Sequence, residues 1–167
     1  MLTHEIPDEI SKIVDWASDD VRGDQDSPSW SPYNRSEQWL TVWAVEQAQG
    51  IIDNGGLQYF FENDWPKNPS YSVFVEAFRR IGAVEAADCI QDAVEMFPFK
   101  SPHLDHQMRR EFLSSLRDKE GGQESAIDKL GFRIMDLGGD TFIRLAKYVQ
   151  ANIDFFPTAK KNAEPFP

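Results

Sequence analysis

Histidine side chains are the first candidates for chemistry, because they serve as general bases and as metal ligands. The chain has three histidines, and His103 and His106 are spaced so that both imidazoles would lie on one face of a helix. Two ligands do not make a zinc site, and no second pair with suitable spacing occurs elsewhere in the chain. We therefore interpret them as solvated residues of a first helical turn, and we expect no metal and no other cofactor.

The single cysteine, Cys89, lies beside Ala86, Ala87 and Ile90, which predicts a packed and unreactive thiol. The sequence contains no nucleophile elbow, phosphate loop or dinucleotide fingerprint, so we expect a protein without a catalytic site. One cysteine cannot form an internal disulfide, and the N-terminus lacks the pattern of a signal peptide. No apolar run is long enough to cross a bilayer. We expect a cytoplasmic protein.

Carboxylates dominate the charge of this chain. It has 28 Asp and Glu against 17 Lys and Arg, a net charge of −11. The excess lies within the first hundred residues, and residues 101–167 carry acids and bases in equal number. Such a chain is repelled by nucleic acid and by anionic membranes, and attracted to basic partners. We expect no direct binding to either of the first two.

Two acidic stripes are the most specific feature of this charge. The four acids Glu85, Asp88, Asp92 and Glu95 are spaced by three, four and three residues, which places them within an arc of roughly 80° on a helix. No base lies among them at a spacing that would form an ion pair, so neighbouring carboxylates repel one another. We expect this stripe to be exposed and to lack Lys or Arg partners.

The second stripe consists of Asp15, Asp19 and Asp20, in the C-terminal half of the first expected helix. The helix dipole disfavours negative charge at that end. Because local rules are most often broken at functional surfaces, both stripes are candidates for partner binding. We expect Asp15, Asp19 and Asp20, like the first stripe, to be exposed and to lack Lys or Arg partners. An ordinary solvated acidic face is the alternative. A hydrolase that uses a pair of Asp or Glu residues is another, although no spacing selects the pair.

The elements that position these residues are helices. Apolar residues recur mostly at helical spacing, which predicts an all-α protein: a single compact domain over residues 1–167 with about seven or eight helices. From about Ser36 to Ile52 the apolar positions surround the helix, so this should be a buried central helix. We expect the other helices to begin at Pro7, to follow Asn54-Gly55-Gly56, to cover 74–81 and 84–97, to begin at Ser101-Pro102, to lie within 123–137, and to follow an Asp140 cap. Residues 158–167 should form a flexible tail.

The residues around the first glycine pair form a motif that resembles that of a known protein family. It comprises Asn54-Gly55-Gly56, then Leu57-Gln58-Tyr59-Phe60-Phe61, and about twenty residues later Ile81-Gly82-Ala83. With these residues the chain resembles a bacterial family, the domain of unknown function typified by the C-terminal region of a DNA-mimic protein. The similarity covers most of residues 36–156. Here Gln58 follows Leu57 directly, whereas many relatives have another residue between them.

The resemblance implies a fold and a mode of action. The typical member is an acidic helical dimer that occupies the DNA-binding surface of a transcription regulator. For this chain that implies sequestration of a basic DNA-binding protein, and it allows a homodimer. The matching residues, including Asn54, Gly55, Gly56, Gln58 and Phe60, are of types that determine a fold rather than a binding site. A general interaction or immunity-type module with incidental acidity is the alternative.

Overall fold

The computed structural model describes residues 8–23, 29–119 and 124–163, and over these residues every regular element is helical. The α-helices are α1 (Asp8–Arg22), α2 (Glu37–Glu62), α3 (Ser72–Arg80), α4 (Val84–Glu95), α5 (His106–Lys119), α6 (Ala126–Asp136), α7 (Gly138–Ala151) and α8 (Pro157–Asn162). Short 3-10 helices η1 (Pro32–Asn34), η2 (Pro102–Leu104) and η3 (Ile153–Phe155) lie between them. The predicted all-α fold is confirmed.

Helix α2 is the buried centre of this fold and packs against α1, α3, α6 and α7. The sequence predicts that it ends before Asn54-Gly55-Gly56, but helical structure continues through Gly55 and resumes at Leu57. Only Gly56 departs from the helix, with φ 70° and ψ −176°, a conformation that is essentially restricted to glycine. The positive φ of Gly56 thus marks a kink within one long helix.

The kink in α2 is packed against α6. A Cβ on Gly131 of α6 would lie 2.9 Å from the backbone nitrogen of Leu57 and 3.5 Å from the Cα of Gly56. Within α2, the Tyr59 side chain fills the space that a Cβ on Gly55 would need. Asn54 donates from its side chain to the carbonyl of Gly50 at 2.7 Å. Glycine therefore allows two helices to approach closely at the kink.

An aromatic cluster lies C-terminal to the kink, where α2 packs against α3. Phe60 and Phe61 are fully buried, and Phe60 contacts Phe74 of α3 edge to face with ring centroids 5.2 Å apart. Trp65 lies 4.6 Å from the same Phe74 ring, and its indole nitrogen donates to the carbonyl of Phe60 at 3.3 Å. Gln58, in the same segment of α2, is half-buried. This cluster holds α3 against the second half of α2.

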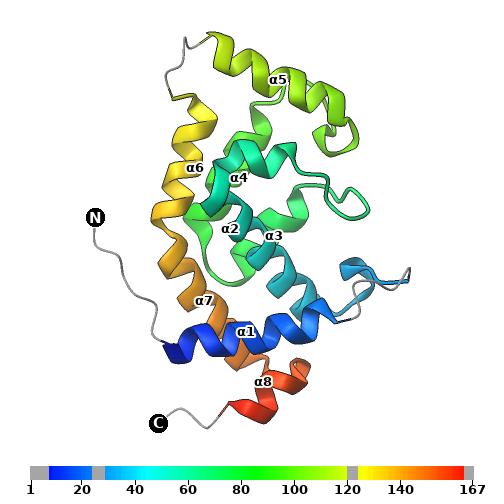
Figure 1. Cartoon of the computed structure of the whole chain (residues 1–167), viewed down its shortest axis with the longest axis vertical. Coiled ribbons are helices and arrows are strands. Elements are labelled where there is room, and N and C mark those ends of the chain that lie inside the picture. The colour runs from blue at the N-terminus through cyan, green and yellow to red at the C-terminus, as the bar shows by residue number, and fades with distance from the viewer. Residues whose placement is uncertain (1–7, 24–28, 120–123, 164–167) are drawn as a thin grey trace.

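The other helices lie around α2 (Figure 1). Helices α6 and α7 follow one another along one side of the molecule, α5 lies at one end, and α1 crosses the other end with α8 beside it. Helix α1 packs on α7, α8 and α2. None of the helices in the described ranges is both long and apolar enough to span a bilayer.

Two expected helix starts are wrong. Ser101-Pro102 does not open a long helix: Ser101 has a left-handed φ of 54°, η2 follows, and α5 begins only at His106. The carboxylate of Asp105 accepts from the amide of Met108 at 2.9 Å, so Asp105 caps α5. Helix α7 begins at Gly138, which places Asp140 inside its first turn rather than at a cap.

The expected flexible tail is corrected where the structure describes it. Pro157–Asn162 forms α8, which packs on α1, and the side chains of Phe156 and Ala159 are fully buried. Asp20 of α1 accepts from the amide of Thr158 through both carboxylate oxygens, at 3.1 and 2.9 Å. A short polar segment is therefore ordered by one capping carboxylate and two apolar contacts. Residues 164–167 lie outside the described residues, as does Pro7, the expected start of α1.

Candidate partner-binding surface

The acidic stripe of α4 faces solvent because the opposite face of the helix is buried. The buried side chains are Ala86, Ala87, Cys89, Ile90 and Ala93, and they face α3 and α6. The four acids of the stripe, Glu85, Asp88, Asp92 and Glu95, are all exposed. Regular amphipathic spacing is enough to place them there.

The expectation that this stripe lacks basic partners is wrong for two of its members. Glu85 forms an ion pair with Arg133 of α6. Asp88 forms one with Arg79 of α3, with 3.1 Å between Oδ1 and Nη2. Both arginines come from neighbouring helices, so a search for bases at helical spacing within α4 does not find them. Exposed pairs of this kind contribute little to stability, but they reduce the charge presented to a partner.

The C-terminal half of the α4 stripe keeps its charge. Asp92 has no ion-pair partner within the described ranges, and Glu95 accepts a hydrogen bond from the neutral side chain of Gln91 at 2.7 Å.

Cys89, one turn before Asp92, is buried, and burial raises the pKa of its thiol, as do the nearby carboxylates Glu85 and Asp92. The thiol is therefore held protonated, in agreement with the predicted packed cysteine.

The α1 stripe also contains acids of two kinds, two that make no ion pair and one that has a structural contact. Asp15 and Asp19 are exposed and make no ion pair with any residue that the structure describes. Asp20 is half-buried and caps α8 through Thr158, so it has a structural contact that the sequence pattern did not indicate. The interaction spans 138 positions in the chain, and no local spacing could indicate it.

The two stripes lie in different parts of the molecule. Helix α1 lies across one end, whereas α4 lies near the middle beside α6 (Figure 1). The main contacts of α1 are with α2, α7 and α8, and those of α4 are with α3 and α6. The structure therefore provides two separate acidic faces: Asp15 and Asp19 on α1, and Asp92 and Glu95 on α4.

The two histidines do not share a helical face, because His103 belongs to η2 and His106 opens α5. Nδ1 of His106 lies 2.7 Å from Oδ1 of Asp64, and this hydrogen bond is the main reason that the pKa of Asp64 is lowered. The ring of His103 contacts Tyr71 edge to face with centroids 6.3 Å apart, and burial lowers the pKa of His103. His106 is a first-turn residue of α5, as expected, but neither histidine is simply solvated, because both are half-buried and contact neighbouring side chains.

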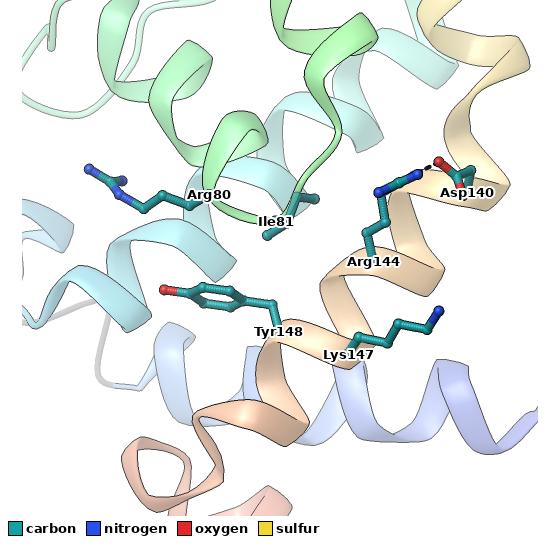
Figure 2. A pocket seen from close by; sticks show the side chains of 6 residues that line it. All are labelled: Arg80, Ile81, Asp140, Arg144, Lys147 and Tyr148. Atoms are coloured by element: carbon teal, nitrogen blue, oxygen red, sulfur yellow. Dashed lines mark hydrogen bonds and ion pairs between the residues drawn. The ribbon is translucent and has the colours of Figure 1, made fainter.

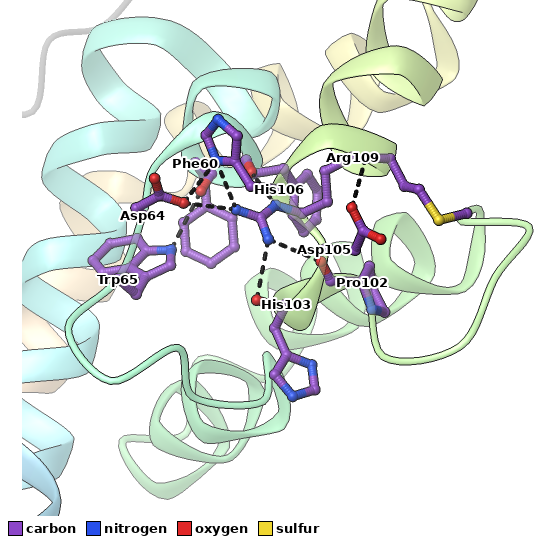
Figure 3. A network of polar contacts seen from close by, with 10 residues as sticks. Phe60, Asp64, Trp65, Pro102, His103, Asp105, His106 and Arg109 are labelled. Atoms are coloured by element: carbon purple, nitrogen blue, oxygen red, sulfur yellow. Dashed lines mark hydrogen bonds and ion pairs between the residues drawn. The ribbon is translucent and has the colours of Figure 1, made fainter.

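Arg109 organises this region, and sequence reasoning missed it (Figure 3). The residue is 2% exposed. Its guanidinium donates to the carbonyls of Phe61, Pro102 and His103 at 2.9, 2.9 and 3.1 Å, and to Asp64 at 3.0 Å. It thereby joins the end of α2, η2 and the start of α5. A lone arginine among charged neighbours gives no signal in the sequence that it is buried.

A pocket lies between the end of α3 and α7 (Figure 2). Its lining residues are Arg80, Ile81, Asp140, Arg144, Lys147 and Tyr148, and its volume is about 280 Å³. No histidine or cysteine lines it. Within the described ranges, no group of three or more His, Cys, Asp or Glu side chains is arranged to hold a metal ion. The pocket is lined mainly by basic and apolar side chains.

Comparison with known families agrees with the resemblance seen around residues 54–83. The family model of DMP19-like protein matches residues 34–152. This range begins just before α2 and ends directly after α7, so α1 and α8 lie outside it. No curated protein and no solved structure matches the chain significantly.

Proposed function

The chain belongs to the DMP19-like protein family, and from this premise we propose that it is an acidic binding protein that sequesters a DNA-binding protein by imitating the DNA backbone. The observation that supports this most directly is a set of exposed carboxylates that have no basic partner among the described residues. These are Asp15, Asp19, Asp92 and Glu95, on a chain of net charge −11.

The physical basis is the charge density of DNA. A duplex presents one negative charge per about 1.7 Å of its axis, and proteins bind it largely by releasing counterions from it. Asp92 and Glu95 are separated by one helical turn or less, about 4.5 Å along the axis, and Asp15 and Asp19 by about 6 Å. Carboxylates held at such spacing on packed helices can occupy a basic DNA-binding groove, although they present no nucleobases for sequence recognition.

The ion pairs of α4 determine which acids contribute. Glu85 and Asp88 already have arginine partners, so a basic partner would have to displace Arg133 or Arg79 to reach them. A basic partner can reach Asp92 and Glu95 without displacing an arginine. We therefore propose that the C-terminal half of α4 is the stronger part of the interface. The acids of α1 are a second face, outside the residues that match the family.

The test begins with capture of partners from the native lysate on the immobilised protein, followed by elution with duplex DNA. Proteins released by DNA are candidates, and each is purified for titration against the wild type and three variants of equal charge. D92K/E95K and D15K/D19K reverse one face each. E111K/E124K reverses two exposed acids elsewhere and is the matched control.

We expect D92K/E95K to weaken binding by at least about tenfold, because attraction becomes repulsion at the contact, while E111K/E124K keeps most of the affinity. Wild-type affinity should also fall steeply with salt. Circular dichroism should show all variants folded, since exposed acids contribute little to stability. Equal loss in the control would mean that only net charge matters. Unchanged binding by both face variants would reject the proposal.

A further inference from the structure

A cation-lined groove runs between α7 and the turn that joins α3 to α4. It consists of the pocket of about 280 Å³ described above and an adjoining pocket of about 210 Å³. The second pocket is lined by Gly82, Ala83, Val84, Glu85, Ala86, Leu137, Asp140, Thr141 and Arg144. Asp140 and Arg144 line both, so the two pockets meet at these side chains.

Two cations stand on one side of this groove. Arg144 and Lys147 are three residues apart on α7 and extend toward the side where Asp140 lies (Figure 2). Lys147 is exposed and has no ion-pair partner in the part of the chain that the structure describes. Arg144 pairs with Asp140, with 2.5 Å between Nε and Oδ2, and both side chains remain about half exposed to solvent. An exposed pair of this type exchanges readily for another anion.

The N-terminal end of α4 borders the same space. Ala83 precedes α4 without a side-chain cap, and the first residues of the helix, Val84, Glu85 and Ala86, line the second pocket. The first N–H groups of a helix lack intrahelical acceptors and carry a partial positive charge. Gly82 turns the chain with φ 79°, and a Cβ there would lie 3.1 Å from Nη1 of Arg144. The turn thus brings the guanidinium close to the start of α4.

The other side of the groove is apolar. Ile81 lies between Arg80 and Arg144, and the ring of Tyr148 extends from α7 toward the side of Arg80 (Figure 2). Arg80 is itself occupied, because it pairs with Glu37 and Glu76 at 3.3 Å each. An anionic group is therefore favoured near Arg144 and Lys147, and an uncharged organic group near Ile81 and Tyr148.

We infer that this groove binds a small organic phosphate monoester, with its phosphate at Arg144, Lys147 and the start of α4, and its organic part over Ile81 and Tyr148. A phosphate dianion offers two charges and three terminal oxygens to two cations and several amides, whereas a carboxylate offers one charge and two oxygens. A nucleic acid polyanion is excluded by the net charge of −11. The inference does not depend on the proposed DNA mimicry.

Asp140 is the residue that competes with the ligand. In the structure its carboxylate accepts from Nε of Arg144, so a phosphate bound to the same guanidinium meets a neighbouring negative charge. Glu85, the other acid along the groove, is held by Arg133. Removing the charge of Asp140 should therefore strengthen binding, which is the opposite of what loss of a merely structural contact would do.

The experiment is an amide NMR titration of the full chain with phenyl phosphate, and with benzoate at equal ionic strength. We expect saturable shifts of the Gly82 to Ala86 amides with phenyl phosphate. R144Q should weaken binding by about tenfold or more, since a charge-assisted hydrogen bond is lost, and D140N should strengthen it several-fold. K147Q should weaken it, whereas K129Q, which removes an exposed lysine on α6, should leave it unchanged.

Three results would overturn the inference. One is the absence of saturable shifts at these amides with the wild type and D140N. Another is benzoate binding as tightly as phenyl phosphate, which would show that the groove does not select phosphate. The last is an equal effect of K147Q and K129Q, which would show that binding depends only on the overall charge of the protein. The substituted side chains lie on helix surfaces, so all variants should fold, and circular dichroism checks this.

Discussion

Gly131 of α6 packs against the backbone of Leu57, so closely that a Cβ on residue 131 would lie 2.9 Å from the Leu57 nitrogen. Leu57 directly follows Gly56, the one residue of α2 with non-helical backbone angles. The kink of the central helix and the glycine of its neighbour are therefore complementary. The contact joins two segments more than seventy residues apart, both within the range that matches the family.

This contact predicts that Gly131→Ala destabilises the protein. The added methyl meets backbone rather than a flexible side chain, so α6 or α2 must move, at a cost of about 1–3 kcal/mol. Gly50→Ala in α2 is the control, because its Cβ would have no neighbour within 4 Å. The free energy of unfolding of that control should equal the wild-type value or exceed it by up to about 1 kcal/mol, since alanine favours helix over glycine. Urea unfolding of both variants measures the difference, and equal midpoints would contradict the close approach.

Gly56→Val tests the kink itself. A Cβ on Gly56 would meet no atom within 4 Å, so any destabilisation must come from the backbone, whose φ of 70° and ψ of −176° suit only glycine. We expect a loss of about 1–3 kcal/mol in the free energy of unfolding. A variant that keeps the wild-type melting temperature would show that the kink is not required by the fold, and a ligand-binding role for this turn would then need study.

The predictable part of this molecule is the part governed by local rules. Helical spacing placed the acids of α4 on the exposed face, and the glycine pair indicated an interruption where the structure has the kink at Gly56, although a helix end was expected there. The contacts that the sequence did not indicate are long-range: Glu85 with Arg133 lies 48 positions apart, and Asp20 with Thr158 lies 138 apart. Such pairs depend on how helices pack, which a pattern within one helix does not contain.

The buried Arg109 network predicts that Arg109→Met is strongly destabilising. The substitution removes the guanidinium donor from the carbonyls of Phe61 and His103, whereas the Pro102 carbonyl keeps the amide of Asp105 at 3.4 Å. Each buried group left unpaired costs about 1–3 kcal/mol. We expect a total loss of about 3 kcal/mol or more, measured by chemical denaturation. Arg110→Met changes the neighbouring exposed arginine and should alter stability by no more than about 0.5 kcal/mol. Similar losses in both would refute the role given to Arg109.

Asp53 and Asp64 should have opposite effects on the pH dependence of stability. Partial burial raises the pKa of Asp53, so its ionisation opposes folding, and stability is lost as pH rises from its ordinary pKa through the raised one. The hydrogen bond from His106 and the charge of Arg109 lower the pKa of Asp64, so its contribution is present above its ordinary pKa and is lost as pH falls through the lowered one.

We therefore expect Asp53→Asn to stabilise the protein at pH 7 and Asp64→Asn to destabilise it. Both differences should shrink in acid, where the wild-type carboxyls are protonated. Thermal unfolding of the two variants and the wild type between about pH 3 and pH 7 measures this. Changes of the same sign at pH 7 would contradict the assignment.

The last prediction concerns the cap that Asp20 of α1 provides for α8. A six-residue helix is too short to be stable alone, and Phe156, at its N-terminal boundary, has no side-chain acceptor for the free amides. Asp20→Asn keeps an acceptor oxygen, whereas Asp20→Ala removes it and should weaken α8 by about 1 kcal/mol, as loss of a capping residue does. The amides of Lys160 and Ala163, which bond within α8, should then exchange faster with solvent. Asp19→Ala removes an exposed charge one residue away and should leave that exchange unchanged. If Asp20→Ala leaves the exchange of these amides at the wild-type rate, the buried side chains of Phe156 and Ala159 alone hold α8 in place.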